Sequence, residues 1–447
     1  MRKNKFKLRL FSGRKITFLL IPPTLVYSNI PHRGISEGGQ GEISNISDKV
    51  DFWGALLPIL TPNDTAIASF FLSCLSIGIF WLGFYFVASN REMSNKHFAL
   101  ALVFGLLGAI FTLQNLRDAF LLSLSMLSLG LIEKYRYSSS TLAKFSFLLP
   151  LVLAVTFKYP SAVAITLLLL LRFFSDSDQS VLRKIILILA GSFSILLMGV
   201  IVDKSLARAA HLERGFVEQS VMYYDLASFY CWSESNSTRS KALETLDPIL
   251  KTEKSQDVCL SHRPNAWIYL VSGGNFKEQG VGPPLQMLSG DPDSERAIVL
   301  RDGWLKTIAG DPVDYIQFKL IAATQILTVG NPFVYAGESF TFLEGAKTPN
   351  DFIWKLLSII LMIIGKSYVF SVSFLLMVCL GIVIRGRFNL WRKSTILSLL
   401  FVNVVNLIVL SIAYVSDEAR YVFPIITLSY IVLAVDFQVN KNKLGLV

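Results

Sequence analysis

The sequence has little charge for its length. Of its 447 residues, 17% are charged and 53% are hydrophobic, whereas soluble domains carry about 25% charged residues. The mean hydropathy is +0.52, and the apolar residues gather in repeated long runs. This pattern excludes an ordinary soluble domain and indicates a polytopic membrane protein.

Several motifs of soluble enzymes are also missing. The four histidines show no metal-ligand spacing, and the chain has neither a phosphate-binding glycine loop nor a nucleophile elbow. ATP-dependent and nucleotide-sugar chemistry therefore receive no support from the sequence.

The apolar runs predict the fold class: an all-α polytopic membrane protein with about ten transmembrane helices and one large extracytoplasmic segment containing interfacial helices. Several runs are shorter than the ~20 residues of an upright span, so tilted or partly embedded helices are expected among them. The first run could be a cleaved signal peptide, but Pro22 and Pro23 favour a retained helix. The runs cover 16–28, 66–88, 98–113, 120–132, 146–157, 161–174, 185–202, 356–384, 395–415 and 422–437.

The positive charge predicts the topology. With the N-terminus in the cytoplasm, the inside segments hold 21 Lys and Arg residues and the short outside loops hold five, as the positive-inside rule requires. The net charge of +10 is therefore a topology signal, and no nucleic-acid partner is expected. The predicted location is the cell membrane, with both termini cytoplasmic.

This topology divides the chain into three parts. Residues 1–202 form an N-terminal membrane domain of about seven helices, with an acidic first outer loop at 29–62. Residues 203–353, with 14 basic and 19 acidic residues, form the extracytoplasmic segment, and residues 354–447 form C-terminal membrane helices. Cys231 and Cys259 both lie in the outer segment, where either a disulfide or two free thiols would fit.

Three basic residues lie at outer helix ends, where they are rare. Arg117, Lys158 and Arg420 each fall within three residues of an apolar run. That depth suits a lipid phosphate, which arginine can bind with two parallel hydrogen bonds. The alternative is that they snorkel or form ion pairs, such as Arg117 with Asp118.

The first outer loop is rich in carboxylates. Glu37, Glu42, Asp48 and Asp51 lie close together in sequence, with Trp53 beside them. A carboxylate can act as general base on an acceptor hydroxyl, and an aromatic ring offers a flat face to a sugar. An ordinary solvated loop is the alternative.

A helix is predicted after Asp311, where Pro312 follows a good N-cap residue. Its apolar positions lie on one face, which predicts a helix along the membrane surface. These positions are Ile316, Leu320, Ala323 and Leu327.

The order of these features resembles the GT-C superfamily of integral-membrane glycosyltransferases, particularly its poorly characterised bacterial members. The matching pieces are the acidic first loop, "LRDAFLLSL", "KYPSA", "QSVMYYDLASFYCWS", "RDGWLKTIAGDPVDYIQFKL" and "EARYVFPI". Related chains often carry a His-Pro pair after the first-loop acid, and this chain has "WGALLPILTP" there instead.

The resemblance implies sugar transfer from a polyprenyl-phosphate donor to a glycan, lipid or protein acceptor on the outer face. Membrane lipids surround the protein and are expected partners as well. It assigns the base or metal partner to Glu37, Asp48 or Asp51, and leaves a divalent metal open as cofactor. Asp118 is counted with the catalytic residues, as a group that orients Arg117 or positions the acceptor. The donor phosphate would be held by Arg117, Lys158, Arg420 and Tyr421.

Three other readings stay open. A lipid-linked glycan polymerase or ligase would use His262 and Arg263. A multi-pass transporter or flippase would show internal repeats and mid-membrane polar groups, of which the sequence offers Asn403, Asn406 and Lys366. The third reading is a non-catalytic assembly subunit.

Overall fold

The fold is all-helical throughout the part of the chain that the structure describes. This computed structural model describes residues 65–89, 95–112, 117–136, 138–175, 179–209, 219–251, 255–262, 293–328, 371–384, 390–413 and 422–436, with positions 270, 284–286, 288 and 369. Within these residues an isolated antiparallel bridge between Leu250 and Leu285 is the β pairing recorded. The predicted all-α class is therefore confirmed for the described residues.

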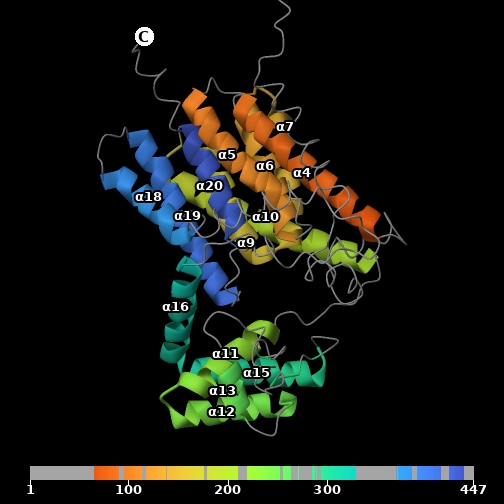
Figure 1. Cartoon of the computed structure of the whole chain (residues 1–447), viewed down its shortest axis with the longest axis vertical. Helices are drawn as coiled ribbons and strands as arrows, with labels where there is room; N and C mark the ends of the chain where they lie inside the picture. Colours follow the sequence, from red (N-terminus) through yellow and green to blue (C-terminus); the bar gives the residue numbers. More distant parts are fainter. Residues whose placement is uncertain are drawn as a thin grey trace, which may run out of the picture.

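The helices form two groups, one above the other in Figure 1. The upper group, called the bundle, contains the described parts of the predicted apolar runs that follow residue 65. Its helices are α4 (Thr65–Ser89), α5 (Asn95–Thr112), α6 (Arg117–Tyr135), α7 (Thr141–Lys144), α8 (Leu148–Phe157), α9 (Tyr159–Phe174), α10 (Val181–Ala209), α18 (Val372–Ile384), α19 (Leu390–Ala413) and α20 (Phe423–Asp436).

The lower group, called the helical unit, has its own hydrophobic core. Tyr223, Phe229 and Leu300 are buried there. Its helices are α11 (Gln219–Trp232), α12 (Asn236–Leu246), the 3-10 turn η2 (Asp247–Ile249), α13 (Gln256–Ser261) and α15 (Glu295–Gly310).

Helix α16 (Pro312–Thr328) joins the two groups. Phe318 packs into the core of the helical unit, whereas Ile326 packs into the core of the bundle. In Figure 1 the helix runs along the long axis of the molecule, away from the helical unit and toward α18 and α19. The sequence therefore located this helix, and the structure shows that it belongs to both cores.

Helix α6 lies at the centre of the bundle, in contact with α4, α5, α8, α9 and α20. It packs most closely on α4, where Gly83 and Gly130 face each other. A Cβ atom at Gly83 would overlap the backbone of Met126, and one at Gly130 would overlap the backbone of Gly83. Small residues at such crossings let helix backbones approach closely, which is typical of helix packing in membranes.

Two described helices are long and apolar enough to cross a membrane: Val181–Leu206 within α10 and Thr395–Ile412 within α19. Just 22% of the α10 window and 39% of the α19 window are buried inside the structure. Shorter apolar stretches of 10–17 residues occur in other described helices of the bundle, among them Phe98–Thr112 and Tyr159–Phe174. Helix α10 therefore presents a long apolar face to its surroundings.

Candidate functional site

The candidate site lies at the N-terminal end of α6. The backbone of Lys158, between α8 and α9, is extended (φ −164°, ψ 93°), and Pro160 lies in the first turn of α9. This break turns Lys158 toward α6, where its Nζ lies 2.8 Å from Asp118 Oδ1 and 3.0 Å from Oδ2. Both side chains are almost fully buried, with 8% and 3% of their surface exposed.

A second carboxylate meets the same chain break. The hydroxyl of Tyr159 donates a hydrogen bond to Asp203 Oδ2 on α10. Successive residues of the sequence "FKYP" therefore contact acidic side chains from two different helices. We call Asp118, Lys158, Tyr159 and Asp203 the N-end cluster.

The structure brings together two of the residues predicted for the site. Asp118 pairs with Lys158, a partner 40 positions away, whereas its predicted partner was the neighbouring Arg117. Arg117 begins α6, but its side chain lies outside the described residues. The other predicted site residues, Glu37, Asp48, Asp51, Arg420 and Tyr421, also lie outside them.

Tyr159 and Asp203 were not among the site residues predicted from the sequence. The available signal was the acidic residue that ends the apolar run 185–202, at the same predicted depth as the short turn "FKYP". An ionisable group at the edge of an apolar helix requires a partner, and the tyrosine of that turn supplies one.

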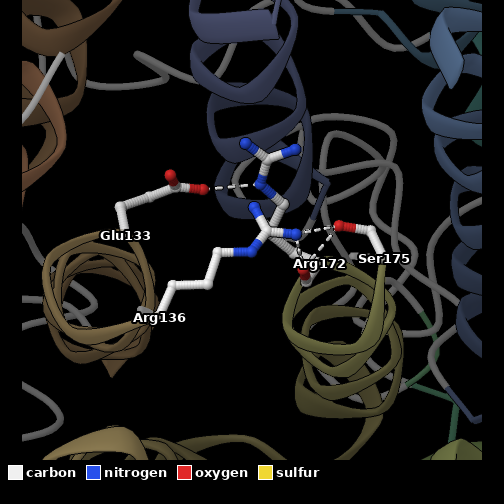
Figure 2. Close-up of polar contacts among 4 residues, drawn as sticks. All are labelled: Glu133, Arg136, Arg172 and Ser175. Carbon is white, nitrogen blue, oxygen red and sulfur yellow. Dashed lines mark hydrogen bonds and ion pairs between the residues drawn. The ribbon is translucent and has the colours of Figure 1, made fainter. Parts of the chain in front are cut away.

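A separate charged cluster lies at the C-terminal end of α6, about 22 Å away at 1.5 Å per residue. Arg172 Nε of α9 donates to Glu133 Oε1 at 2.5 Å. Arg136 donates through one terminal nitrogen to the Arg172 carbonyl at 3.1 Å and to Ser175 Oγ. Figure 2 shows these four side chains converging between α6 and α9.

This C-end cluster, defined as Glu133, Arg136, Arg172 and Ser175, is explained by helix structure. The last carbonyl groups of a helix have no partner within the helix and carry partial negative charge. Arg136 donates to one of them, the Arg172 carbonyl, which also accepts from the Ser175 hydroxyl, and Glu133 balances the Arg172 guanidinium. The cluster thus fastens α9 to α6, and it is not assigned to the candidate site.

The helical unit contains a third buried ion pair, at its junction with the bundle. Lys319 Nζ of α16 lies 2.6 Å from Asp225 Oδ1 of α11, and it donates to the Ile412 carbonyl of α19 at 3.3 Å. Trp304 Nε1 donates to Asp225 Oδ2 at 3.0 Å. One lysine therefore connects α11, α16 and the end of α19.

Burial dominates the electrostatics of this pair. It raises the pKa of Asp225 above its ordinary value of 3.8, and the contacts with Lys319 and Trp304 oppose that rise. Burial also raises the pKa of Tyr224 and Tyr315, whose rings lie 5.7 and 5.2 Å from Lys319 Nζ. These phenols stay neutral at physiological pH, so their rings can stabilise the ammonium group.

His262, the candidate residue of a polymerase or ligase, is packed in the core of the helical unit. It is 3% exposed, and its ring stacks on Trp232 with centroids 4.5 Å apart. Its Nε2 lies 2.8 Å from Ser228 Oγ, and Ser228 donates its single proton to the Tyr224 carbonyl. With that proton engaged, His262 is the donor to Ser228 and does not activate it as a nucleophile.

No group of three or more His, Cys, Asp or Glu side chains in the described ranges could hold a metal ion. The first-loop carboxylates, to which a metal partner was assigned, lie outside those ranges. No family model, no curated protein and no solved structure matches this chain.

Cys231 and Cys259 form a disulfide, with their Cα atoms 5.4 Å apart and a separation of 28 positions in sequence. It connects the end of α11 to α13. We expect Cys259→Ser to lower the free energy of unfolding of the helical unit by about 2–4 kcal/mol, since the bond restricts the unfolded chain. Thermal unfolding in detergent measures this loss. The double variant with Cys231→Ser should lose no more than the single one, and an unchanged midpoint would contradict the prediction.

Proposed function

We propose that this chain is a multi-pass membrane glycosyltransferase of the GT-C type, which transfers a sugar from a polyprenyl-phosphate donor on the extracytoplasmic face. The proposal includes about ten spans, cytoplasmic termini and an extracytoplasmic helical unit. The apolar faces of α10 and α19 support the membrane part, because contiguous exposed apolar surface of this size requires an apolar partner. Leu189 and Phe193 are among the exposed side chains of α10.

The observation that carries the proposal is the buried Asp118–Lys158 pair at the end of an apolar bundle. Ionisable groups in such places are costly, and they mark functional sites more often than structural ones. In the proposed topology the pair lies at the depth of the lipid headgroups on the outer side. Asp118 holds the Lys158 ammonium in place with contacts of 2.8 and 3.0 Å, so the cation is oriented before a donor arrives.

The chemistry of transfer gives each group a task. The bond between the sugar C1 and the donor phosphate breaks, and the polyprenyl phosphate leaves with additional negative charge. Lys158 stabilises this charge as it develops. The acceptor hydroxyl forms the new bond to C1 and gives its proton to a general base, which the sequence assigns to Glu37, Asp48 or Asp51. We assign Tyr159 and Asp203, which are hydrogen-bonded to each other, to positioning the acceptor.

The disulfide supports the same topology. Disulfides persist in oxidising compartments and are rare in the cytosol, and Cys231 and Cys259 both belong to the helical unit. An outward-facing unit is the arrangement that the distribution of Lys and Arg also favours.

The proposal is tested with purified protein in detergent and a panel of radiolabelled polyprenyl-phosphate sugars. We expect Lys158→Ala to lower kcat/KM by about 10²–10³-fold, the cost of removing one group that stabilises transition-state charge. Lys158→Arg should retain part of the activity. Lys204→Ala is the matched control, because it removes an exposed lysine next to Asp203 and should leave turnover unchanged. If the unaltered protein transfers sugar from none of these donors, the proposal is wrong.

A further inference from the structure

Helix α16 has an apolar outer face that the fold leaves uncovered. At 100° per residue, positions 313, 316, 320 and 324 fall on one side of the helix. Val313, Ile316 and Leu320 are 62%, 58% and 60% exposed. A helix that faced water on this side would carry charged and polar residues there.

The polar groups of α16 agree with an apolar environment. Lys319 lies outside this face, buried against Asp225. Thr324 is exposed, but its hydroxyl donates to the Ile321 carbonyl within the helix. Gln317 is also exposed on this face, and its amide is polar but uncharged. No described residue of this face is charged.

The position of α16 indicates what covers this face. Lys319 donates to the Ile412 carbonyl, so the middle of α16 is level with the C-terminal end of α19. The following turns of α16 lie beside α18 and α19, whose outer faces are also apolar, with Ile408 and Met377 exposed. The uncovered face of α16 thus continues the apolar surface of the bundle.

We propose that the outer face of α16 contacts lipid, and that the helix rises obliquely or upright through the outer leaflet instead of lying flat on it. The inference rests on the membrane placement in the proposed function and is independent of sugar transfer. Because Phe318 packs into the core of the helical unit and Ile326 packs into the core of the bundle, depth in the bilayer increases along the helix. Positions 313 and 324 are separated by about 16 Å along its axis.

Spin labels measure this depth. Cys74 and Cys379, the cysteines outside the disulfide, are replaced by alanine, and a nitroxide is attached at Val313→Cys, Ile316→Cys, Leu320→Cys or Thr324→Cys in turn. The protein is reconstituted into phosphatidylcholine and phosphatidylglycerol nanodiscs. Accessibility to oxygen, which concentrates in acyl chains, is compared with accessibility to a water-soluble nickel chelate. We expect the ratio of oxygen to nickel accessibility to increase from 313 to 324.

Two control positions separate the outcomes. Phe193→Cys on the exposed face of α10 reports lipid, and Lys241→Cys on α12 reports water. If Phe193 is lipid-accessible while all four α16 positions are water-accessible, the α16 inference fails and the membrane proposal survives. Equal depth at the four positions would show a flat surface helix, and low accessibility to both reagents would show a protein partner. Either result overturns the inference. Water accessibility at Phe193 as well would overturn the membrane proposal itself.

Discussion

Lys319→Met is expected to destabilise the protein by about 3–5 kcal/mol at neutral pH, because it leaves the Asp225 carboxylate buried without its cation. Lys319 lies 2.6 Å from Asp225 and also donates to the end of α19, so the loss should affect the junction of the helical unit with the bundle. Thermal unfolding in detergent, followed by circular dichroism, measures the change.

The sign of the pH dependence follows from the pKa of Asp225. Burial already raises that pKa above 3.8, and Lys319 opposes the rise, so the variant has a still higher pKa in the folded state. The unfolded chain releases its proton near pH 3.8, whereas the folded variant retains it to higher pH. The unfolded state is the same in both proteins, so the destabilisation relative to the unaltered protein should be absent while Asp225 is protonated in both folded states. It should grow as the pH increases past the value at which the carboxyl ionises beside Lys319.

A double variant isolates the charge. Asp225→Asn with Lys319→Met removes both charges, and the asparagine amide oxygen can still accept the bond from Trp304. It should be more stable at pH 8 than Lys319→Met alone, with little of its pH dependence. Equal loss of stability at pH 4 and pH 8 in the single variant would contradict the assignment of an ionised pair.

The second large effect is expected at the C-end cluster. Arg172→Leu leaves Glu133 buried between α6 and α9 without the guanidinium that lies 2.5 Å away. We expect the free energy of unfolding to decrease by about 3–5 kcal/mol. The measurement is thermal unfolding in the same detergent, with Arg183→Ala, an exposed arginine of α10, as the control that removes a charge without a buried partner.

Restoration by a second change tests the explanation. Replacing a buried ion pair by apolar side chains of similar volume is often neutral, so Glu133→Leu with Arg172→Leu should recover most of the lost stability. The bond from Arg136 to the backbone carbonyl of residue 172 remains available in this variant. Failure of the double variant to recover would indicate that the cluster does more than fasten α9 to α6.

The helices of the bundle were predictable because apolar run length is a local property. The run 185–202 falls within α10, which begins at Val181 and ends at Ala209. The run 161–174 falls within α9, which begins at Tyr159 and ends at Phe174. Helix ends are the least certain part of such predictions. The boundary drawn at 202 falls inside α10, which continues to Ala209. A charged residue such as Asp203 ended the apolar run without ending the helix, because a partner, Tyr159, was available.

Part of the candidate site was also predictable. Lys158 was selected because a basic residue at the outer end of an apolar run is rare, and Asp118 was selected as the neighbour that orients Arg117 or positions the acceptor. The pairing of the two residues was not predictable. It depends on the extended backbone at Lys158, between α8 and α9, which turns the lysine side chain toward α6. The same limit applies to Lys319 and Asp225, which are 94 positions apart and were not selected at all.

Local composition thus decides which segments are apolar helices and which side of a membrane the basic loops favour. It also decides where a rare charged residue lies at the end of an apolar run. These depend on the transfer of individual residues between water and an apolar phase. The choice of ionic partners, the two cores shared by α16 and the separation of the N-end and C-end clusters depend on how distant helices pack. Burial makes each of those contacts strong, and burial is a property of the assembled structure alone.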